Sequence, residues 1–312
     1  MSVWFKNLVV YRLPEDWQWS AAELEERLSR RRLRDCTSLE MFNRGWEPPA
    51  GPTSDDGRLV HTVNRRHLIA LGTNQKLLPA AIVKQVAQER AKVLEGEQGH
   101  AVGRRQLREI KERVETELRA RALTQRKTMR AWIDPDNGWL IVDSAGAPRA
   151  EELVETLRDT LDSLAVVPLD SDPSPQTAMG AWLAADAGPG RFSIDQDLEL
   201  QAADKTKATV RYTRHPLQSR EIKAHLTGGK FVAKLGLTWS DRLAFILTDK
   251  LHVQRVKFLE LAPDAAATQG AEDIGAEEQF AADFALMTGE LGTMLSELIT
   301  ALGIPRERRV AA

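Results

Sequence analysis

The sequence has little cysteine and no long apolar run. Cys36 is the only thiol in 312 residues, so no disulfide can form within the chain, as is usual in the reducing cytosol. No apolar run reaches the roughly 18 residues that a membrane-spanning helix needs. The N-terminal stretch, MSVWFKNLVVYRLPEDW, has too short an apolar run for a signal peptide. These absences predict a cytoplasmic protein that does not enter a membrane.

The motifs of metal and nucleotide chemistry are also missing from the sequence. None of the six histidines lies in an H-E-x-x-H pattern, and one cysteine cannot form a cysteine-based zinc site. Residues 228–230 (GGK) look like the end of a P-loop, but Phe231 stands where Ser or Thr would hold magnesium. A helix end followed by a strand fits them better. Near Asp134 the spacing fails for a calcium loop, because Gly138 comes one place early. We therefore expect no cofactor, no metal and no catalytic site.

The positions of the tryptophans and of the cysteine are explained better by packing in a core than by a functional role. The eight tryptophans could stack on unpaired bases, but most lie beside other apolar residues, which favours packing in a core. Cys36 has no evident partner and is expected to be a small buried residue. The tryptophans are Trp4, Trp17, Trp19, Trp46, Trp132, Trp139, Trp182 and Trp239.

Charge is unevenly distributed along the chain, although the net charge is only −2. Lys and Arg exceed Asp and Glu by 6 over residues 84–130 and by 9 over residues 205–257. Asp and Glu are in excess by 12 over residues 131–204 and by 7 over residues 258–312. A basic block attracts phosphate whatever the net charge, because electrostatic fields act over about 8–10 Å at physiological salt. The alternative is that these blocks are solvated helix faces that balance one another.

The two basic blocks supply the candidate phosphate-binding residues. Arg104 and Arg105 follow a glycine-rich stretch, 96–103. Because alternate residues of a strand share a face, Lys230 and Lys234 are expected to point the same way. Contacts from Arg and Lys to phosphate give affinity without sequence information. The candidates in the second block are Arg211, Arg214, Lys223, Lys230 and Lys234.

Strand and helix patterns alternate in the first half of the chain. Ser20 and Glu23 fit a capping box at a helix start. From Pro79 to Leu123 apolar residues recur at helical spacing on both sides of 96–103, which predicts two helices and an exposed turn that project from the body. Asn137-Gly138 predicts a hairpin over 129–143. We also expect a strand over 3–13, a loop over 43–57, two strands over 58–71 that turn near Asn64, and a helix over 149–164.

The second half begins after a proline-rich stretch, 168–176, that is typical of a domain boundary. Residues 277–302 have apolar residues at helical spacing and predict a long helix. The length of the chain fits two or three domains. The other elements expected are a helix over 179–184, strands over 191–200 and 207–213, a helix over 219–226, strands over 230–238, 242–248 and 252–259, and a loop over 263–276.

Four stretches of the sequence carry family motifs. They are residues 3–8 (VWFKNL) with 11–13 (YRL), residues 132–134 (WID) with Asn137-Gly138, residues 229–235 with Trp239, and residues 282–284 (ADF) with 286–291 (LMTGEL). In order and spacing, over nearly the whole chain, these stretches resemble the RdgC family of bacterial recombination-associated proteins. Each motif alone is weak, but together they are specific.

The resemblance implies an α+β homodimer that closes into a ring. Its positively charged central hole would encircle double-stranded DNA without reading sequence, on the nucleoid in the cytoplasm. The protein would compete with the RecA recombinase for DNA and restrain strand exchange. A central antiparallel-sheet domain (1–76 and 125–170) would be flanked by a helical tip domain (77–124) and an α+β base domain (171–312). Four of the candidates match basic positions of the family's base domain: Arg211, Arg214, Lys230 and Lys234.

Two positions depart from the family pattern. The turn at the tip is usually rich in Lys and Arg, whereas residues 99–103 read GHAVG and the basic residues resume at Arg104 and Arg105. Leu123 stands where an aromatic residue is expected at the subunit contact. We expect Leu123 to fill an apolar pocket at that dimer interface.

Two other functions stay open at this point. A metal-dependent nucleic-acid enzyme, such as a nuclease, would need a cluster of carboxylates or histidines that binds magnesium or manganese. A protein-interaction module could bind a basic partner through the acidic segments 131–204 and 258–312. The same acidic segments could instead keep the outside of a ring away from DNA, which we prefer.

Overall fold

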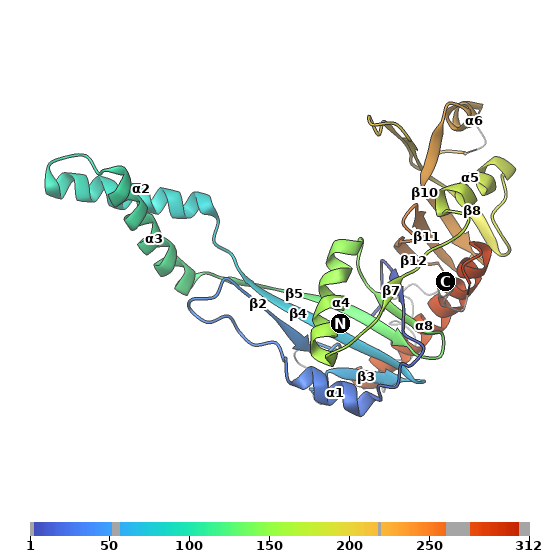
Figure 1. Ribbon diagram of the computed structural model, residues 1–312, viewed down its shortest axis with the longest axis horizontal. Helices are drawn as coiled ribbons and strands as arrows, with labels where there is room; N and C mark the ends of the chain where they lie inside the picture. The colour runs from blue at the N-terminus through green and yellow to red at the C-terminus, as the bar shows by residue number, and fades with distance from the viewer. Residues whose placement is uncertain (1–2, 52–56, 218–219, 260–274, 306–312) are drawn as a thin grey trace.

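The computed structural model describes residues 3–51, 57–217, 220–259 and 275–305. The chain is elongated and curved, with a helical hairpin at one end and a small sheet with its helices at the other (Figure 1). We call residues 80–121 the hairpin arm and residues 175–258 the sheet arm. A larger sheet lies between them, so the molecule has a concave side between its two arms (Figure 1).

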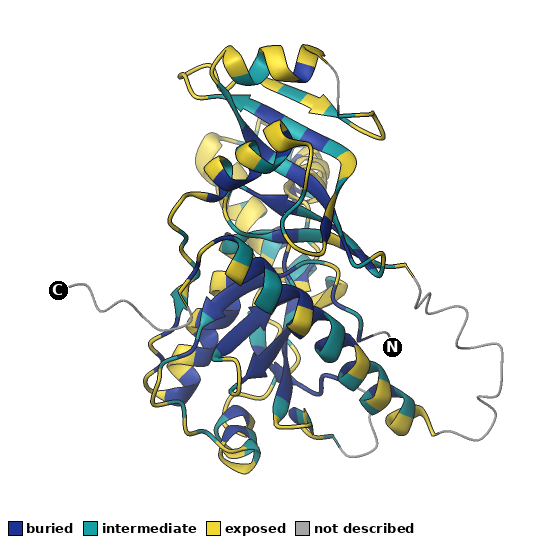
Figure 2. Cartoon of the chain, turned by 90° about the vertical axis from the view of Figure 1, so that its right-hand side faces the viewer, coloured by how far each residue is buried: buried dark blue, intermediate teal, exposed yellow. Residues whose placement is uncertain are grey.

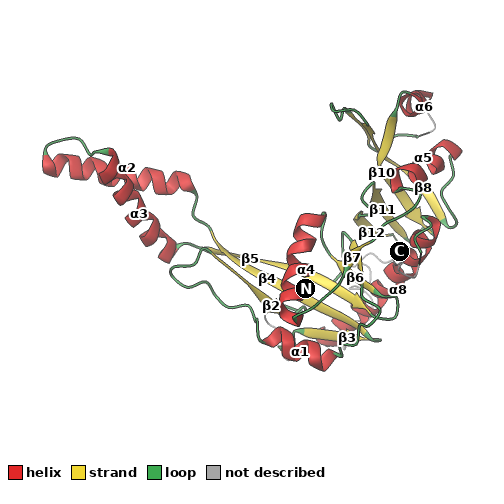
Figure 3. Ribbon diagram, viewed as in Figure 1, coloured by secondary structure: helices red, strands yellow, loops and turns green. Residues whose placement is uncertain are grey.

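The larger sheet has seven strands in the order β2-β4-β5-β6-β1-β7, with β3 paired to β4 (Figure 3). Its pairs are antiparallel. Strands β4 and β5 are the longest and carry the chain out to the hairpin arm and back (Figure 3). The strands are β1 (Val9–Arg12), β2 (Phe42–Glu47), β3 (Val60–Val63), β4 (Arg66–Lys76), β5 (Thr124–Asp134), β6 (Trp139–Val142) and β7 (Val167–Pro168).

Residues suited to tight turns connect these strands. Gly138 takes a φ of 68° between β5 and β6. Asn137 donates its backbone N–H and its side-chain amide to Asp134, at 3.1 and 2.9 Å. Asn64 and Arg65 take φ values of 50° and 63° between β3 and β4, which confirms the turn expected there.

Helices α1 (Ala21–Ser29) and α4 (Ala147–Leu161) cover one face of the larger sheet. The expected capping box starts α1, because the N–H of Glu23 donates to Ser20 Oγ and the N–H of Ser20 donates to Glu23. Leu24 of α1 and Leu153 of α4 are fully buried in the same core as Trp46. These helices end before the outer parts of β4 and β5, which stay open toward the hairpin arm (Figure 1).

The hairpin arm consists of α2 (Ala80–Gln98) and α3 (Arg104–Arg121). Gly99 ends α2 with a φ of 74°, a left-handed conformation that glycine adopts without strain. A small core around Val83 and Val114 and an ion pair from Arg90 to Glu117 hold the two helices together. The arm therefore has its own packing and projects from the body, as the sequence predicts (Figure 1).

The sheet arm contains five antiparallel strands in the order β12-β11-β10-β8-β9. One face of this sheet is apolar and packs against helices. Figure 2 shows buried residues in dark blue along these strands. The strands are β8 (Phe192–Ala202), β9 (Thr209–Tyr212), β10 (Lys230–Trp239), β11 (Leu243–Thr248) and β12 (Val253–Phe258), and the helices are α5 (Pro175–Ala185) and α6 (Arg220–Thr227).

Helix α8 (Ala276–Ala301) packs in a core that both sheets share. Phe284 and Leu291 are buried in one continuous cluster with Trp132 of the larger sheet and Leu237 of the smaller one. The apolar stripe expected over 277–302 is thus buried along its length, and α8 joins the two sheets.

The expected α+β class is confirmed, and most of the expected elements are present. Two expectations were wrong. Residues 42–47 form β2 rather than a loop, because Gly45 lets the backbone of Arg31–Leu33 approach closely; a Cβ there would lie 2.6 Å from the nitrogen of Leu33. The first strand begins only at Val9, because Leu8 pairs with Val253 of β12 instead. Of the loop expected over 263–276, residues 263–274 lie outside the described residues.

The tryptophans pack as expected. Trp46, Trp132, Trp139 and Trp239 are buried, and the other four are partly buried. None of the eight is therefore a fully exposed platform for bases.

We expect Phe284→Ala to lower the free energy of unfolding by about 3–5 kcal/mol, because it leaves a cavity in the core shared by the two sheets. Urea denaturation followed by circular dichroism measures the change. Leu286→Ala is the matched control on the same helix; its side chain is exposed, so a loss under about 1 kcal/mol is expected. Equal losses for the two variants would contradict the joining role of α8.

Candidate nucleic-acid interface

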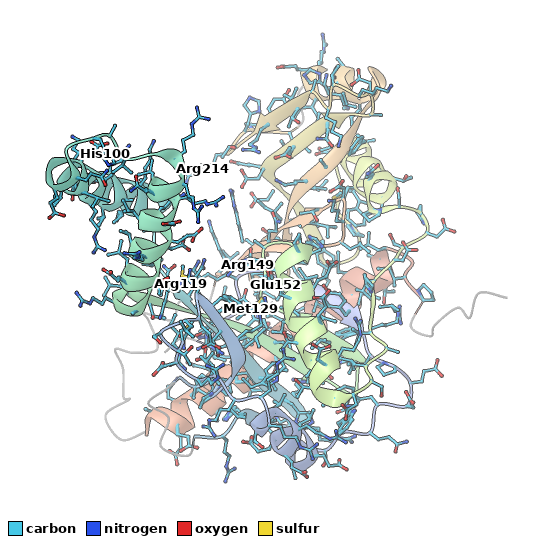
Figure 4. The ribbon with its side chains drawn as sticks, turned by 60° about the vertical axis from the view of Figure 1, so that its left-hand side comes forward. His100, Arg119, Met129, Arg149, Glu152 and Arg214 are labelled. Carbon is cyan, nitrogen blue, oxygen red and sulfur yellow. The ribbon has the colours of Figure 1, made fainter. Side chains whose placement is uncertain are left out.

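The concave side carries cationic side chains from several elements. Figure 4 is turned so that the hairpin arm comes forward and labels residues around this side. His100 lies at the end of the hairpin arm, Arg119 near the root of α3, Met129 on β5, Arg149 and Glu152 on α4, and Arg214 just after β9 (Figure 4).

On the sheet arm, two of the predicted cations meet at one carboxylate. Arg211 of β9 donates Nε and Nη2 to Glu199 Oε2 of β8, at 3.0 and 2.7 Å. Lys234 of β10 donates to the same oxygen at 3.2 Å. A small cavity of about 80 Å³ lies against this group, and Thr213 and Arg255 also line it. The structure therefore brings Arg211 and Lys234 together, on the polar face of the small sheet.

Glu199 stays ionised in this arrangement. Burial favours the neutral acid, but the hydrogen bonds from Arg211 and Lys234 outweigh burial and lower the pKa of Glu199. The group of three side chains thus carries a formal charge of +1 rather than +2 near neutral pH.

The expectation that Lys230 and Lys234 point the same way was wrong. The pairing of β10 with β8 shifts between Val232 and Lys234, so a β-bulge reverses the alternation of side chains. Nζ of Lys230 lies 3.1 Å from Nδ1 of His225 on α6, whereas Lys234 contacts Glu199 on the opposite face. Lys223 is exposed on α6, the same helix that Lys230 contacts through His225.

Arg214 is exposed and takes a left-handed backbone conformation, with a φ of 51°. Residues with a Cβ seldom adopt this conformation, and it costs roughly 1 kcal/mol. Strained backbone conformations of this kind are found more often at functional sites than elsewhere. Lys205 and Lys207 are exposed in the turn between β8 and β9 and add positive charge to the same end of the sheet.

Arg104 and Arg105 lie on the other arm, at the first two positions of α3. The positive end of the helix dipole disfavours cations there, by about 0.3–1 kcal/mol. Arg105 is partly compensated by Glu109, at 3.2 Å, and both arginines are exposed. The predicted cations therefore lie on both arms: Arg104 and Arg105 on the hairpin arm, and Arg211, Arg214 and Lys234 on the sheet arm.

Of two cations between the arms, Arg149 was missed from the sequence, and Lys127 was recognised only as part of the basic block 84–130. Arg149 is exposed in the first turn of α4, close to Glu152 in Figure 4. Lys127 is exposed on the outer part of β5. Counting charge by segment missed Arg149 because its neighbours in sequence are acidic. The available signal was an arginine in the first turn of an expected helix, where the dipole favours Asp or Glu.

Leu123 is 79% exposed at the point where the hairpin arm meets the larger sheet. The N–H of Leu77, also exposed, donates to the carbonyl of Leu123 at 2.8 Å. Leu39 is 70% exposed. It lies near the end of α3, where Arg119 donates to its carbonyl. We call Leu39, Leu77 and Leu123 the neck patch. Exposed leucines gathered at one place are typical of a protein contact.

Within the described ranges, no three His, Cys, Asp or Glu side chains are grouped so that they could hold a metal ion. Every described helix is too short or too polar to cross a bilayer.

Two antiparallel sheets, joined by one helix and extended by a helical hairpin, define an elongated α+β protein with cationic side chains on both arms. A family model described as "Putative exonuclease, RdgC" matches residues 3–304. The chain belongs to the RdgC family, as the sequence motifs indicate.

Similar proteins extend over the full length. The recombination-associated protein RdgC of Dechloromonas aromatica is 47% identical over 304 residues, which cover 96% of this chain and 98% of that protein. The protein of the same name from Cupriavidus pinatubonensis is 45% identical over 306 residues, which cover 98% of this chain and all of that protein. That of Bordetella pertussis is 41% identical over 311 residues, covering 99% of this chain and all of its own.

We expect Arg214→Gly to keep or raise the free energy of unfolding, by up to about 1 kcal/mol, because glycine adopts a positive φ without strain. Arg211→Gly is the matched control. It removes the same charge from a β-strand, where glycine costs roughly 0.5–1 kcal/mol. Chemical denaturation of both variants checks the difference, and a larger loss for Arg214→Gly would show that its backbone is not strained.

Proposed function

We propose that this protein binds double-stranded DNA through the phosphate backbone, without reading its sequence. Two chains form a ring in this proposal, with their concave sides facing a central hole that encloses the duplex. The observation that carries the proposal is the position of the accessible cations: exposed Arg104 and Arg105 lie on one arm, and exposed Arg211 and Arg214 with half-buried Lys234 lie on the other.

Physical chemistry supports contact with the backbone rather than with bases. Lys and Arg that neutralise phosphates release condensed counterions, which gives affinity for any sequence. The described tryptophans are at least partly buried, which leaves the cations as the groups best placed to meet nucleic acid.

In the proposed ring, each chain is divided into three domains. Residues 77–124 form a tip domain, residues 171–312 a base domain, and residues 1–76 with 125–170 a central domain between them. The neck patch lies at the junction of tip and centre, where Leu123 would contact the second chain.

The relatives are named recombination-associated proteins, and we extend that role to this chain. A ring around DNA occupies the duplex that the RecA recombinase needs. We propose that competition of this kind restrains strand exchange, and that the protein acts on the nucleoid in the cytoplasm without catalysing a reaction.

We expect the combined replacement of Arg211, Arg214, Lys230 and Lys234 by Ala to weaken duplex binding at least about 100-fold at 0.1 M salt, because each lost phosphate contact removes about 0.9 from the slope of log K against log salt. Fluorescence anisotropy with two labelled duplexes of equal length and different sequence measures the loss. Both duplexes should lose equally, and an unchanged affinity would refute this surface.

The β-bulge in β10 provides a control within the same strand. Lys234→Ala should weaken binding more than Lys230→Ala, because Lys230 faces α6 and Lys234 lies beside Arg211. Larger loss in Lys230→Ala would assign the DNA contact to the opposite face.

We expect Leu123→Asp to shift the protein from dimer to monomer, because a carboxylate cannot be buried unpaired in an apolar contact. Sedimentation velocity at several protein concentrations measures the shift. Val93→Asp is the matched control: its side chain is also exposed, but it lies on α2 away from the neck patch. Loss of the dimer in both variants, or in neither, would argue against the neck patch.

A metal-dependent nuclease is the second candidate, because the matching family model is described as an exonuclease. Incubation of purified protein with end-labelled duplex in Mg²⁺ or Mn²⁺ tests it. Degradation that a chelator abolishes would establish the enzyme, whereas intact DNA under conditions of full binding supports the binding protein.

A further inference from the structure

We propose that Glu199 competes with DNA phosphate for Arg211 and Lys234, and so limits how tightly the sheet arm holds a duplex. This inference rests on the proposed binding of DNA. It adds a residue that sets affinity through the cations it occupies.

The contact geometry resembles that of a bound phosphate oxygen. One oxygen of Glu199, Oε2, accepts three hydrogen bonds: from Nε and Nη2 of Arg211 at 3.0 and 2.7 Å, and from Nζ of Lys234 at 3.2 Å. Arg and Lys bind phosphate oxygens with the same donors. Glu199 therefore occupies donors that a phosphate would use.

The carboxylate is less exposed than the two cations, which leaves the cations accessible to DNA. The side chain of Glu199 is 14% exposed, whereas that of Arg211 is 65% exposed and that of Lys234 is 35% exposed. A phosphate can thus approach from outside while the carboxylate stays behind the cations. Arg211 has five N–H donors and uses two on Glu199, so three lie outside this contact.

The surrounding charges do not cancel the effect of Glu199. The cavity beside it is also lined by Asp197 of β8 and by Arg255 of β12. Glu199, Asp197, Arg211, Lys234 and Arg255 together carry a formal charge of +1, which removal of the Glu199 charge would raise to +2. The attraction for phosphate at this site depends directly on that difference.

Glu199 could instead help binding by holding the two cations in place. Glu199→Gln separates these roles, because the amide keeps an oxygen acceptor of the same size and removes the charge. If competition dominates, E199Q binds DNA more tightly. If positioning dominates, E199Q binds DNA equally or less tightly.

The experiment compares the full-length wild-type chain and E199Q on one labelled duplex over a series of salt concentrations. We expect E199Q to bind about fivefold to tenfold more tightly at 0.1 M salt, with a slope of log K against log salt steeper by up to about 0.9. E199D keeps the charge and should bind like wild type. Glu26→Gln is the matched control, because it removes one charge from α1, which lies away from the concave side, and it should change affinity less than twofold.

The outcomes separate this inference from the proposed function. If wild type binds DNA and E199Q binds no more tightly, the competition by Glu199 is overturned and DNA binding stands. If neither protein binds DNA at low salt, the proposed function itself fails. Should circular dichroism show that E199Q is unfolded, Glu199→Ser removes the same charge with a smaller side chain and decides in the same way.

Discussion

Helix α8 packs between the two sheets and joins the larger sheet to the sheet arm. On one flank, Arg66 of the larger sheet donates to Thr288, and the N–H of Phe5 contacts the sulfur of Met287. On the other flank, Trp239 of the small sheet donates Nε1 to Glu297 at 2.8 Å. Because packed cores deform little, this shared core holds the larger sheet and the sheet arm in one arrangement. The hairpin arm is attached separately, through the outer parts of β4 and β5 (Figure 3).

Three of the cations occupy positions that cost stability. Arg214 takes a left-handed backbone, Arg104 lies at the positive end of α3, and Arg149 stands in the first turn of α4. Proteins tolerate such breaks of local rules where the surrounding fold supplies the compensation. Glu199 relieves part of the repulsion between Arg211 and Lys234 on the sheet arm. Stability and phosphate affinity oppose one another at that carboxylate.

Periodicity in the sequence was sufficient to predict the helices, the hairpin turn at Gly138 and the projecting arm, because these depend on local patterns. It failed at β2, where Gly45 allows the backbone of Arg31–Leu33 to approach closely. That contact joins two segments and leaves no periodic pattern in either of them. The same limit applies to the site. A β-bulge at 232–234 is set by pairing with β8, so the alternation of side chains placed Lys230 on the wrong face. Arg149 was missed because charge summed along a segment does not reveal which side chains share a surface.

The open shape of one chain has a consequence for the proposed ring. One chain is open on its concave side (Figure 1), so closure of the proposed ring depends on contacts between two chains. The neck patch offers apolar surface near one arm, where Leu39 and Leu123 are largely exposed. DNA in the hole would contact both chains, and any ligand that binds only the assembled form stabilises that form. Assembly and DNA binding are then coupled: a weaker neck contact lowers apparent DNA affinity even when every cation is intact. In the proposed ring, DNA affinity would thus be set jointly by apolar burial at the neck and by the net charge around Glu199.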